Sequence, residues 1–142
     1  MIMADMFEKL VFKQEDIISF KDGIPGFEKF HSFVVVTLTE HAPFEWLVCT
    51  EDTSLRFVII NPLAIDPGYN PDITKTQLEG LGFNSADDVL IYVIVTLRTN
   101  LLESTANFVG PLFINKKKMV GRQIVVDSEK YSVQEPVIKN SR

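Results

Sequence analysis

The chain has 142 residues, of which 46% are hydrophobic and 23% charged, and its apolar residues are spread over the whole length. This balance excludes a disordered or fibrous protein and predicts one globular domain over residues 1–142, with a loose tail over about 137–142. The net charge of −5 is uneven: residues 1–71 hold eleven acidic and five basic side chains, and residues 72–142 hold eight and nine. An acidic chain is poorly suited to nucleic acid and better suited to a basic protein partner.

The single cysteine and the N-terminal residues indicate the compartment. Cys49 has no second cysteine to pair with, so an intrachain disulfide is excluded and a reducing environment is favoured. The first residues lack the basic and apolar stretches of a secretion signal, and no apolar run is long enough to cross a membrane. We therefore predict a cytoplasmic protein without a membrane partner.

Short apolar runs bounded by Gly, Pro, Asn and Asp follow one another along the chain, which is typical of an all-β protein. The run over residues 17–20 leads into two turn dipeptides, Asp22-Gly23 and Pro25-Gly26, which bend the chain sharply around Ile24 and Phe27. The runs expected to form strands are Leu10–Lys13, Ile17–Phe20, Phe33–Leu38, Trp46–Thr50, Phe57–Ile60, Val89–Leu97, Phe108–Ile114 and Met119–Val126.

One short helix is expected after a proline-rich connection in the middle of the chain. Thr74 and Gln77 fit a capping box, and Ile73 and Leu78 stand at the two positions of a hydrophobic staple. A glycine at position 80 or 82 would end the helix in the left-handed conformation. A helix of about two turns is not stable alone, so it must dock on the sheet.

The strand expected at 89–97 is apolar on both faces. Ile91, Val93 and Val95 alternate with Leu90, Tyr92 and Ile94, so neither face suits solvent. Such a strand belongs in the centre of a barrel or sandwich. The predicted fold is mainly β: a compact antiparallel β-barrel-like domain with one short helix that plugs one opening.

The sequence has no arrangement of residues that is typical of a catalytic, metal or cofactor site. His31 and His41 stand ten residues apart without further ligands at metal-binding spacing. Cys49 lies in an apolar run without an accompanying base. The acidic pairs Glu51-Asp52 and Asp87-Asp88 are typical of solvated strand ends. We predict neither an enzyme nor a cofactor-binding protein.

Four segments of the chain carry recognisable motifs. Residues 18–28 read I-x-F-x-x-G-I-P-G-F-E, and residues 57–62 read F-x-x-x-N-P. Residues 104–115 read S-T-A-N-F-x-x-P-L-x-I-N before a basic turn, and residues 121–124 read G-R-Q-I. These segments resemble those of flagellar assembly factors of the FliW type, whose pattern has an aliphatic residue where this chain has Phe108. They occur in the family's order over nearly the whole chain, although residues 64–72 do not align.

The resemblance implies a bacterial cytoplasmic regulator without catalytic activity. Members of the family bind the RNA-binding repressor CsrA and antagonise its repression of flagellin mRNA translation, and they also bind flagellin, which competes for them. The expected partners are therefore a CsrA-type translational regulator and flagellin, with no direct contact to nucleic acid. A closed barrel has few exposed strand edges, so we expect a monomer when the protein is alone.

Six residues are candidates for partner contacts. Acidic side chains of the first half would form a docking face for a basic repressor if they cluster, and two asparagines stand in the family segment at 104–115. Turn geometry and backbone capping explain the asparagines equally well. The candidates are Glu40, Glu45, Glu51, Asp52, Asn107 and Asn115.

Two other classes of function stay open. A small barrel can bind an apolar ligand or a single-stranded nucleic acid, with Lys116–Lys118 as the basic contact. The many large side chains disfavour a ligand cavity, and the net charge disfavours nucleic acid. Catalytic groups can also converge from distant strands, which leaves room for an enzyme.

Overall fold

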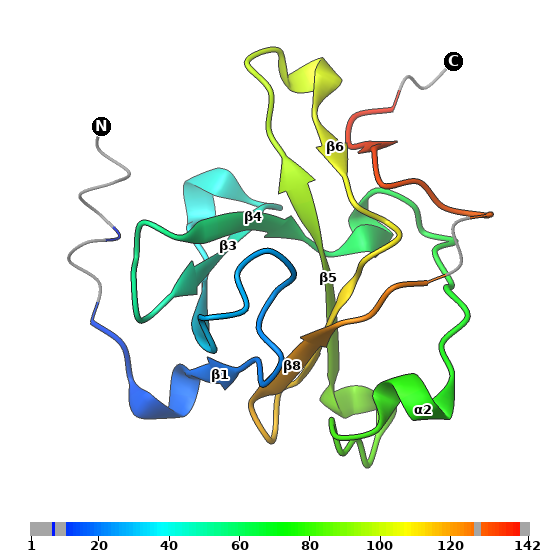
Figure 1. Ribbon diagram of the computed structural model, residues 1–142. Coiled ribbons are helices and arrows are strands. Elements are labelled where there is room, and N and C mark those ends of the chain that lie inside the picture. Colours follow the sequence, from blue (N-terminus) through cyan, green and yellow to red (C-terminus); the bar gives the residue numbers. More distant parts are fainter. Residues whose placement is uncertain (1–6, 8–10, 127–128, 140–142) are drawn as a thin grey trace.

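The computed structural model describes residues 7, 11–126 and 129–139 (Figure 1). Its nine strands form one sheet, in which seven close a barrel in the order β4-β3-β2-β1-β8-β7-β5, because β4 also pairs with β5. The strands are β1 (Ile18–Ser19), β2 (Ser32–Val36), β3 (Glu45–Cys49), β4 (Arg56–Ile60), β5 (Val89–Thr96), β6 (Thr105–Ala106), β7 (Leu112–Asn115), β8 (Val120–Gln123) and β9 (Glu135–Pro136). The mainly β, barrel-like fold is thus confirmed.

Helical structure among the described residues is limited to short elements. The helix α2 has four residues, Lys75–Leu78, and the remaining elements are single 3₁₀ turns. These turns are η1 (Gln14–Asp16), η2 (Thr39–His41), η3 (Pro62–Ala64), η4 (Ala86–Asp88) and η5 (Leu101–Glu103).

The first four strands form an antiparallel meander, and β1 then closes the barrel against β8 in parallel. This closure uses one pair of facing residues, Ser19 and Val120, with the Ser19 amide donating to the Met119 carbonyl at 2.9 Å. A β-carbon at Gly121 would lie 2.7 Å from the Phe20 ring. Glycine therefore allows the aromatic side chain to fill the interior beside this seam.

Strand β5 is buried on both faces, as its sequence predicts. Tyr92 on one face joins the barrel interior, whereas Val93 and Val95 on the other join an outer cluster with Tyr69 and Phe108. The interior is filled by large side chains: Ile18, Phe20, Ile24, Phe33, Leu47, Cys49, Ile59, Tyr92, Leu112 and Ile114. This packing does not favour a ligand inside the barrel.

The predicted helix start is confirmed, but its predicted place is wrong. Thr74 and Gln77 form both halves of the capping box, and Gly80 follows the helix with φ +89°. Leu78 packs on a cluster that contains Phe113, which faces outward from β7, while its neighbours Leu112 and Ile114 face inward. The helix therefore covers the outside of the barrel wall and plugs no opening.

The structure changes the expected strands at both ends of the chain. Residues 11–13 form no strand, and Leu10 lies outside the described residues. Phe12 instead packs against the outer cluster around Val34 and Val48.

Strands β6 and β9 were not expected, because two residues are too few for a recognisable alternation. In the predicted tail, the Val137 amide donates to the Ser104 carbonyl at 3.1 Å, and residues 140–142 lie outside the described residues.

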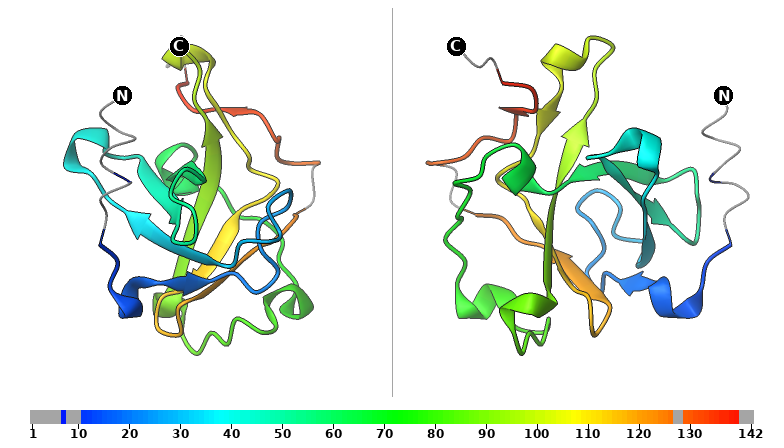
Figure 2. Two further views of the ribbon diagram at one scale, coloured as in Figure 1. Left: turned by 60° about the vertical axis from the view of Figure 1, so that its left-hand side comes forward. Right: turned by 180° about the vertical axis from the view of Figure 1, so that it is seen from behind.

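A hairpin arm, residues 97–104 between β5 and β6, projects from the barrel wall. Figure 1 shows it at the top in yellow-green, on the opposite side of the molecule from α2. At its base, the Arg98 amide donates to the Ser104 hydroxyl at 2.9 Å. In both views of Figure 2 the arm projects from the barrel, and residues 97–103 are exposed.

Candidate protein-binding surface

The motif at 18–28 forms a tight loop over one end of the barrel. The Gly23 amide donates to the Phe20 carbonyl at 2.9 Å, and the Phe27 amide donates to the Ile24 carbonyl at 2.7 Å. Gly23 has φ +69°, and a β-carbon there would lie 2.7 Å from the Glu28 α-carbon. The two arms of the loop therefore meet so closely that only glycine fits.

This loop sends one large side chain inward and another outward. Ile24 is 2% exposed and belongs to the barrel interior, where it anchors the loop. Phe27 is 39% exposed and packs the edge of its ring against Phe57 of β4, with centroids 5.4 Å apart. The loop thus presents Phe27 and the exposed Pro25 to solvent.

Three exposed carboxylates belong to this loop and to the β3–β4 turn, and backbone or hydroxyl donors keep them ionised. Hydrogen bonds from the His31 and Ser32 amides, at 2.8 and 3.1 Å, lower the pKa of Glu51. The Ser54 hydroxyl and amide lower the pKa of Asp52, and the Gly26 amide lowers that of Glu28. We call Phe27 with these carboxylates, Glu28, Glu51 and Asp52, the motif surface.

The four acidic candidates do not form one face. Glu51 and Asp52 follow β3, whereas Glu40 and Glu45 precede or begin it, so β3 separates the two pairs. Glu45 is half-buried, accepts a hydrogen bond from the Thr37 hydroxyl at 2.6 Å and lies beside Tyr92 of the interior. Glu40 is exposed on η2.

Both asparagine candidates hold turns together. The Asn107 side chain accepts hydrogen bonds from the Val109 and Gly110 amides, each at 3.0 Å. Asn115 is fully buried; it accepts from the Lys117 and Lys118 amides and donates to the Leu81 carbonyl at 2.7 Å. These contacts fix the connection before β7 and the β7–β8 hairpin.

An apolar hollow lies at the other end of β3, between η2 and the base of the arm. Its volume is about 390 Å³, and we call it the arm hollow. In the rear view of Figure 2, η2 (cyan) lies beside the base of the arm. The lining residues are Glu40, His41, Ala42, Phe44, Trp46, Val58, Leu97 and Leu101. These residues belong to separate strands and turns, and the sequence did not predict that they would lie together.

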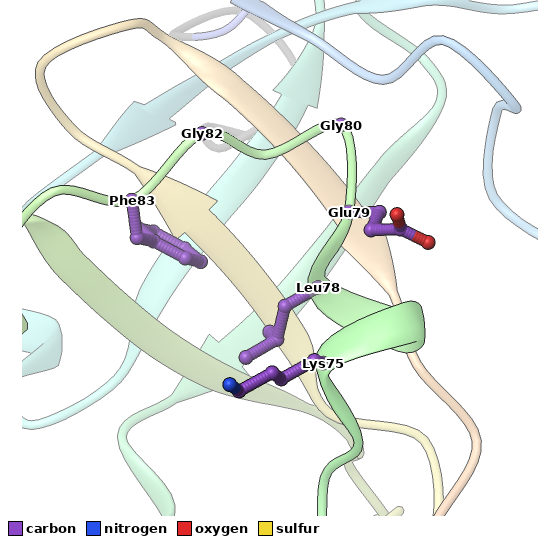
Figure 3. Close-up of a pocket in the computed structure, with 6 residues that line it drawn as sticks. All are labelled: Lys75, Leu78, Glu79, Gly80, Gly82 and Phe83. Carbon is purple, nitrogen blue, oxygen red and sulfur yellow. The ribbon is translucent and has the colours of Figure 1, made fainter.

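A second hollow, of about 280 Å³, lies beside the segment that follows α2 (Figure 3). Leu78 and Phe83 turn toward the barrel wall, where they pack on Leu81 and Phe113, and Glu79 points away from them. The hollow is thus a gap beside a docked segment, and its apolar side chains already have partners.

The residues considered for catalysis or metal binding are dispersed. Within residues 7, 11–126 and 129–139, no group of three or more His, Cys, Asp or Glu could hold a metal ion. Cys49 is buried, and burial raises the pKa of its thiol, which disfavours a reactive thiolate. His41 accepts a hydrogen bond from the Trp46 indole, and His31 lies near the Phe20 carbonyl. In the part of the chain that the structure describes, no helix is long and apolar enough to span a membrane.

These observations define the class: a closed seven-stranded β-barrel with an outer helix, a projecting arm and two exposed surfaces at opposite ends of β3. Comparison with known proteins then gives the family. The model of the family described as "FliW protein" matches residues 1–137, so the chain belongs to the FliW family.

Named relatives agree with this membership. The chain is 37% identical over 134 residues to the flagellar assembly factor FliW of Alkaliphilus metalliredigens, covering 94% of this chain and 83% of that protein. It is 34% identical to the FliW of Thermoanaerobacter pseudethanolicus over 134 residues, covering 94% and 89%. A crystal structure of the flagellar assembly factor FliW superposes with a TM-score of 0.86 at 31% identity, covering 94% and 93% of the two chains.

Proposed function

We propose that this protein regulates flagellin synthesis in the cytoplasm by binding two proteins in turn. It binds a CsrA-type translational repressor and so relieves repression of flagellin mRNA, and flagellin competes for it. The motif surface carries this proposal: three exposed carboxylates, each with a lowered pKa, lie on the motif loop and the β3–β4 turn, and Phe27 of the same loop is 39% exposed. An RNA-binding repressor must carry a basic surface, and this surface complements it.

The geometry of the motif surface suits a fast, selective encounter. Hydrogen bonds already fix the three carboxylates, so binding orders few side chains and loses little conformational entropy. Phe27 packs on Phe57 and so offers an ordered aromatic side chain for a partner to contact. Opposite charges on the partner would increase the association rate, and added salt would reduce it.

Neutralising the carboxylates tests the motif surface. The triple variant Glu28→Gln, Glu51→Gln and Asp52→Asn keeps the hydrogen-bond acceptors and removes three charges. Each exposed ion pair contributes modestly, so the loss of all three should lower affinity for the repressor about tenfold at low salt, with a shallower dependence on salt concentration. Isothermal titration calorimetry between 50 and 500 mM salt measures both quantities, with the salt range chosen to span strong and weak screening.

A matched control removes three exposed carboxylates from elsewhere: Glu15→Gln, Asp72→Asn and Glu79→Gln. It has the same net charge as the test variant and should bind like the parent protein. Equal losses in both variants would show that only net charge matters and would contradict a defined surface. Failure of the parent protein to bind the repressor, or to restore translation of a repressed flagellin reporter, would contradict the proposed function itself.

A further inference from the structure

The short turn η2 borders the arm hollow and is tied to the barrel wall through one histidine. The Trp46 indole N–H donates to His41 Nδ1 at 3.1 Å, and the two ring centroids lie 6.0 Å apart. Within residues 7, 11–126 and 129–139, this is the one side-chain hydrogen bond between η2 and the barrel. The position of η2 beside the hollow therefore depends on the state of the His41 ring.

The direction of this hydrogen bond fixes the proton of His41. An indole nitrogen can only donate, so Nδ1 must accept, and the imidazole is neutral with its proton on Nε2. A protonated imidazole carries an N–H group at both ring positions and accepts no hydrogen bond. Protonation of His41 would therefore set its Nδ1–H against the indole N–H and break the contact.

Trp46 stays in place when this contact breaks, because its other contacts hold it on the barrel wall. Its ring packs on Phe7, with centroids 5.1 Å apart, and on the outer cluster around Val34 and Val48. The η2 turn, by contrast, has only three residues, and no side chain caps its start. The turn is thus the element that moves, and its movement widens the arm hollow.

The charged groups around His41 favour a protonated ring that has turned away from the indole. Glu40, next to it on η2, is exposed and lines the same hollow, so its carboxylate can pair with the imidazolium. Glu45 of β3 already accepts a hydrogen bond from a threonine hydroxyl, and Arg56 of β4 lies over a phenylalanine ring. The charged residues of the arm are exposed and do not line the hollow: Arg98 and Glu103.

We propose that His41 is a pH-sensitive switch of the arm hollow. The neutral ring holds η2 on Trp46 and keeps the hollow narrow, whereas the protonated ring releases η2 and opens the hollow. Histidine is the side chain that ordinarily gains its proton between about pH 8 and pH 5. The switch changes the shape of an apolar surface, and it operates in the protein alone, whichever partners the protein binds.

The chain permits a direct test, because it has one tryptophan and two histidines. Between about pH 8 and pH 5, Trp46 emission should shift to longer wavelength and its quenching by acrylamide should increase, while the far-UV circular dichroism stays constant. His41→Gln keeps an acceptor for the indole but takes up no proton, so both fluorescence signals should keep their values at high pH. His31→Gln is the matched control and should behave like the parent protein.

Four results would overturn this inference. The first is unchanged Trp46 emission in the parent protein, and the second is a shift that persists in His41→Gln, because another group would then be titrating. The third is weaker emission at constant wavelength and constant acrylamide access, since a protonated ring that stays in place quenches the indole without moving η2. The fourth is a parallel loss of circular dichroism in parent and variant, which would mean that the whole barrel unfolds. Each of these results would leave the proposed function standing.

Discussion

Glu51 has an exposed side chain that binds backbone amides. Its carboxylate lies after the end of β3 and accepts hydrogen bonds from the amides of His31, which precedes β2, and Ser32, which begins β2. The sequence Glu51-Asp52 is typical of a solvated turn, and both residues are indeed exposed. The partner amides lie twenty residues earlier, so only the fold could reveal this contact.

Replacing Glu51 should affect stability in a pH-dependent way. Glu51→Ala should lower the free energy of unfolding at pH 7 by about 1 kcal/mol or less, because an exposed charged hydrogen bond contributes modestly. Since the fold lowers the pKa of Glu51, its stabilisation is present above its ordinary value of 4.5 and disappears as the pH falls through the lowered pKa. Urea denaturation should therefore show parent and variant converging at low pH, whereas the control Asp72→Ala should match the parent throughout.

Gly23 should be the least replaceable residue of the motif loop. In Gly23→Ala, the residue would keep a positive φ, and its β-carbon would lie only 2.7 Å from the Glu28 α-carbon. This substitution should destabilise the fold by about 2–4 kcal/mol. Gly26→Ala has φ +90° but no neighbour within 4 Å, so only the backbone penalty of about 1–2 kcal/mol applies. Melting curves rank the two variants. A loss at Gly26 equal to that at Gly23 would show that close packing of the loop arms is unimportant.

The four-residue helix α2 depends on side chains from the barrel. Arg122 of β8 donates through Nη1 to the carbonyls of Gln77 and Glu79, at 2.8 and 2.7 Å. Its Nε lies 3.6 Å from the Asp22 carboxylate, which links the helix end to the motif loop. The Gln77 side chain donates to the Val125 carbonyl at 3.1 Å. So short a helix persists because these contacts and its apolar face dock it.

Removing the Arg122 contacts should release α2 before the barrel. Arg122→Met keeps an apolar stem but no donors, so amide hydrogen exchange over residues 74–82 should accelerate while β3–β5 stay protected. Lys75→Met, an exposed position on the same helix, provides the control. Uniform acceleration across the whole barrel would instead show that Arg122 supports the global fold and not one element.

Local sequence patterns predicted the individual elements well, but they did not predict the contacts between elements. The capping box of α2 lies within four residues and could be read directly, and the double burial of β5 follows from its alternation. Which wall the helix covers depends on Phe113 and Ile124, far away in the sequence. The arm hollow joins residues from η2, β3, β4 and the arm, so no single run of sequence carries its pattern.

At the scale of the whole molecule, the barrel separates the acidic residues that the sequence places close together. Charge counts could show that the first half is acidic, but the strand direction decides that Glu45 turns toward Tyr92 while Glu51 reaches solvent. The two asparagines of the family segment hold turns, which agrees with the turn chemistry of their sequence context. Whether any of the six candidates contacts a partner stays a prediction.

The barrel interior should make the protein sensitive to alkali. Burial, with the nearby Glu45 carboxylate, raises the pKa of Tyr92 to about 12. Because folding raises this pKa, Tyr92 contributes its full stabilisation of the folded state below pH 10, the ordinary tyrosine value. That contribution is lost as the pH rises through 12. Tyr92→Phe has no such group, so its stability should fall less steeply between pH 9.5 and 11.5 in guanidinium titrations. Parallel curves for the two proteins would contradict this.

The parallel pairing of Ser19 with Val120 joins parts of the chain that are roughly a hundred residues apart. Closing so long a loop is entropically unfavourable and yields few contacts, so we expect the seam to form late in folding, after the local β1–β4 meander. On the ribosome, the ring cannot close until β8 has emerged. The motif surface belongs to that meander, so we expect it to take shape before the barrel is complete.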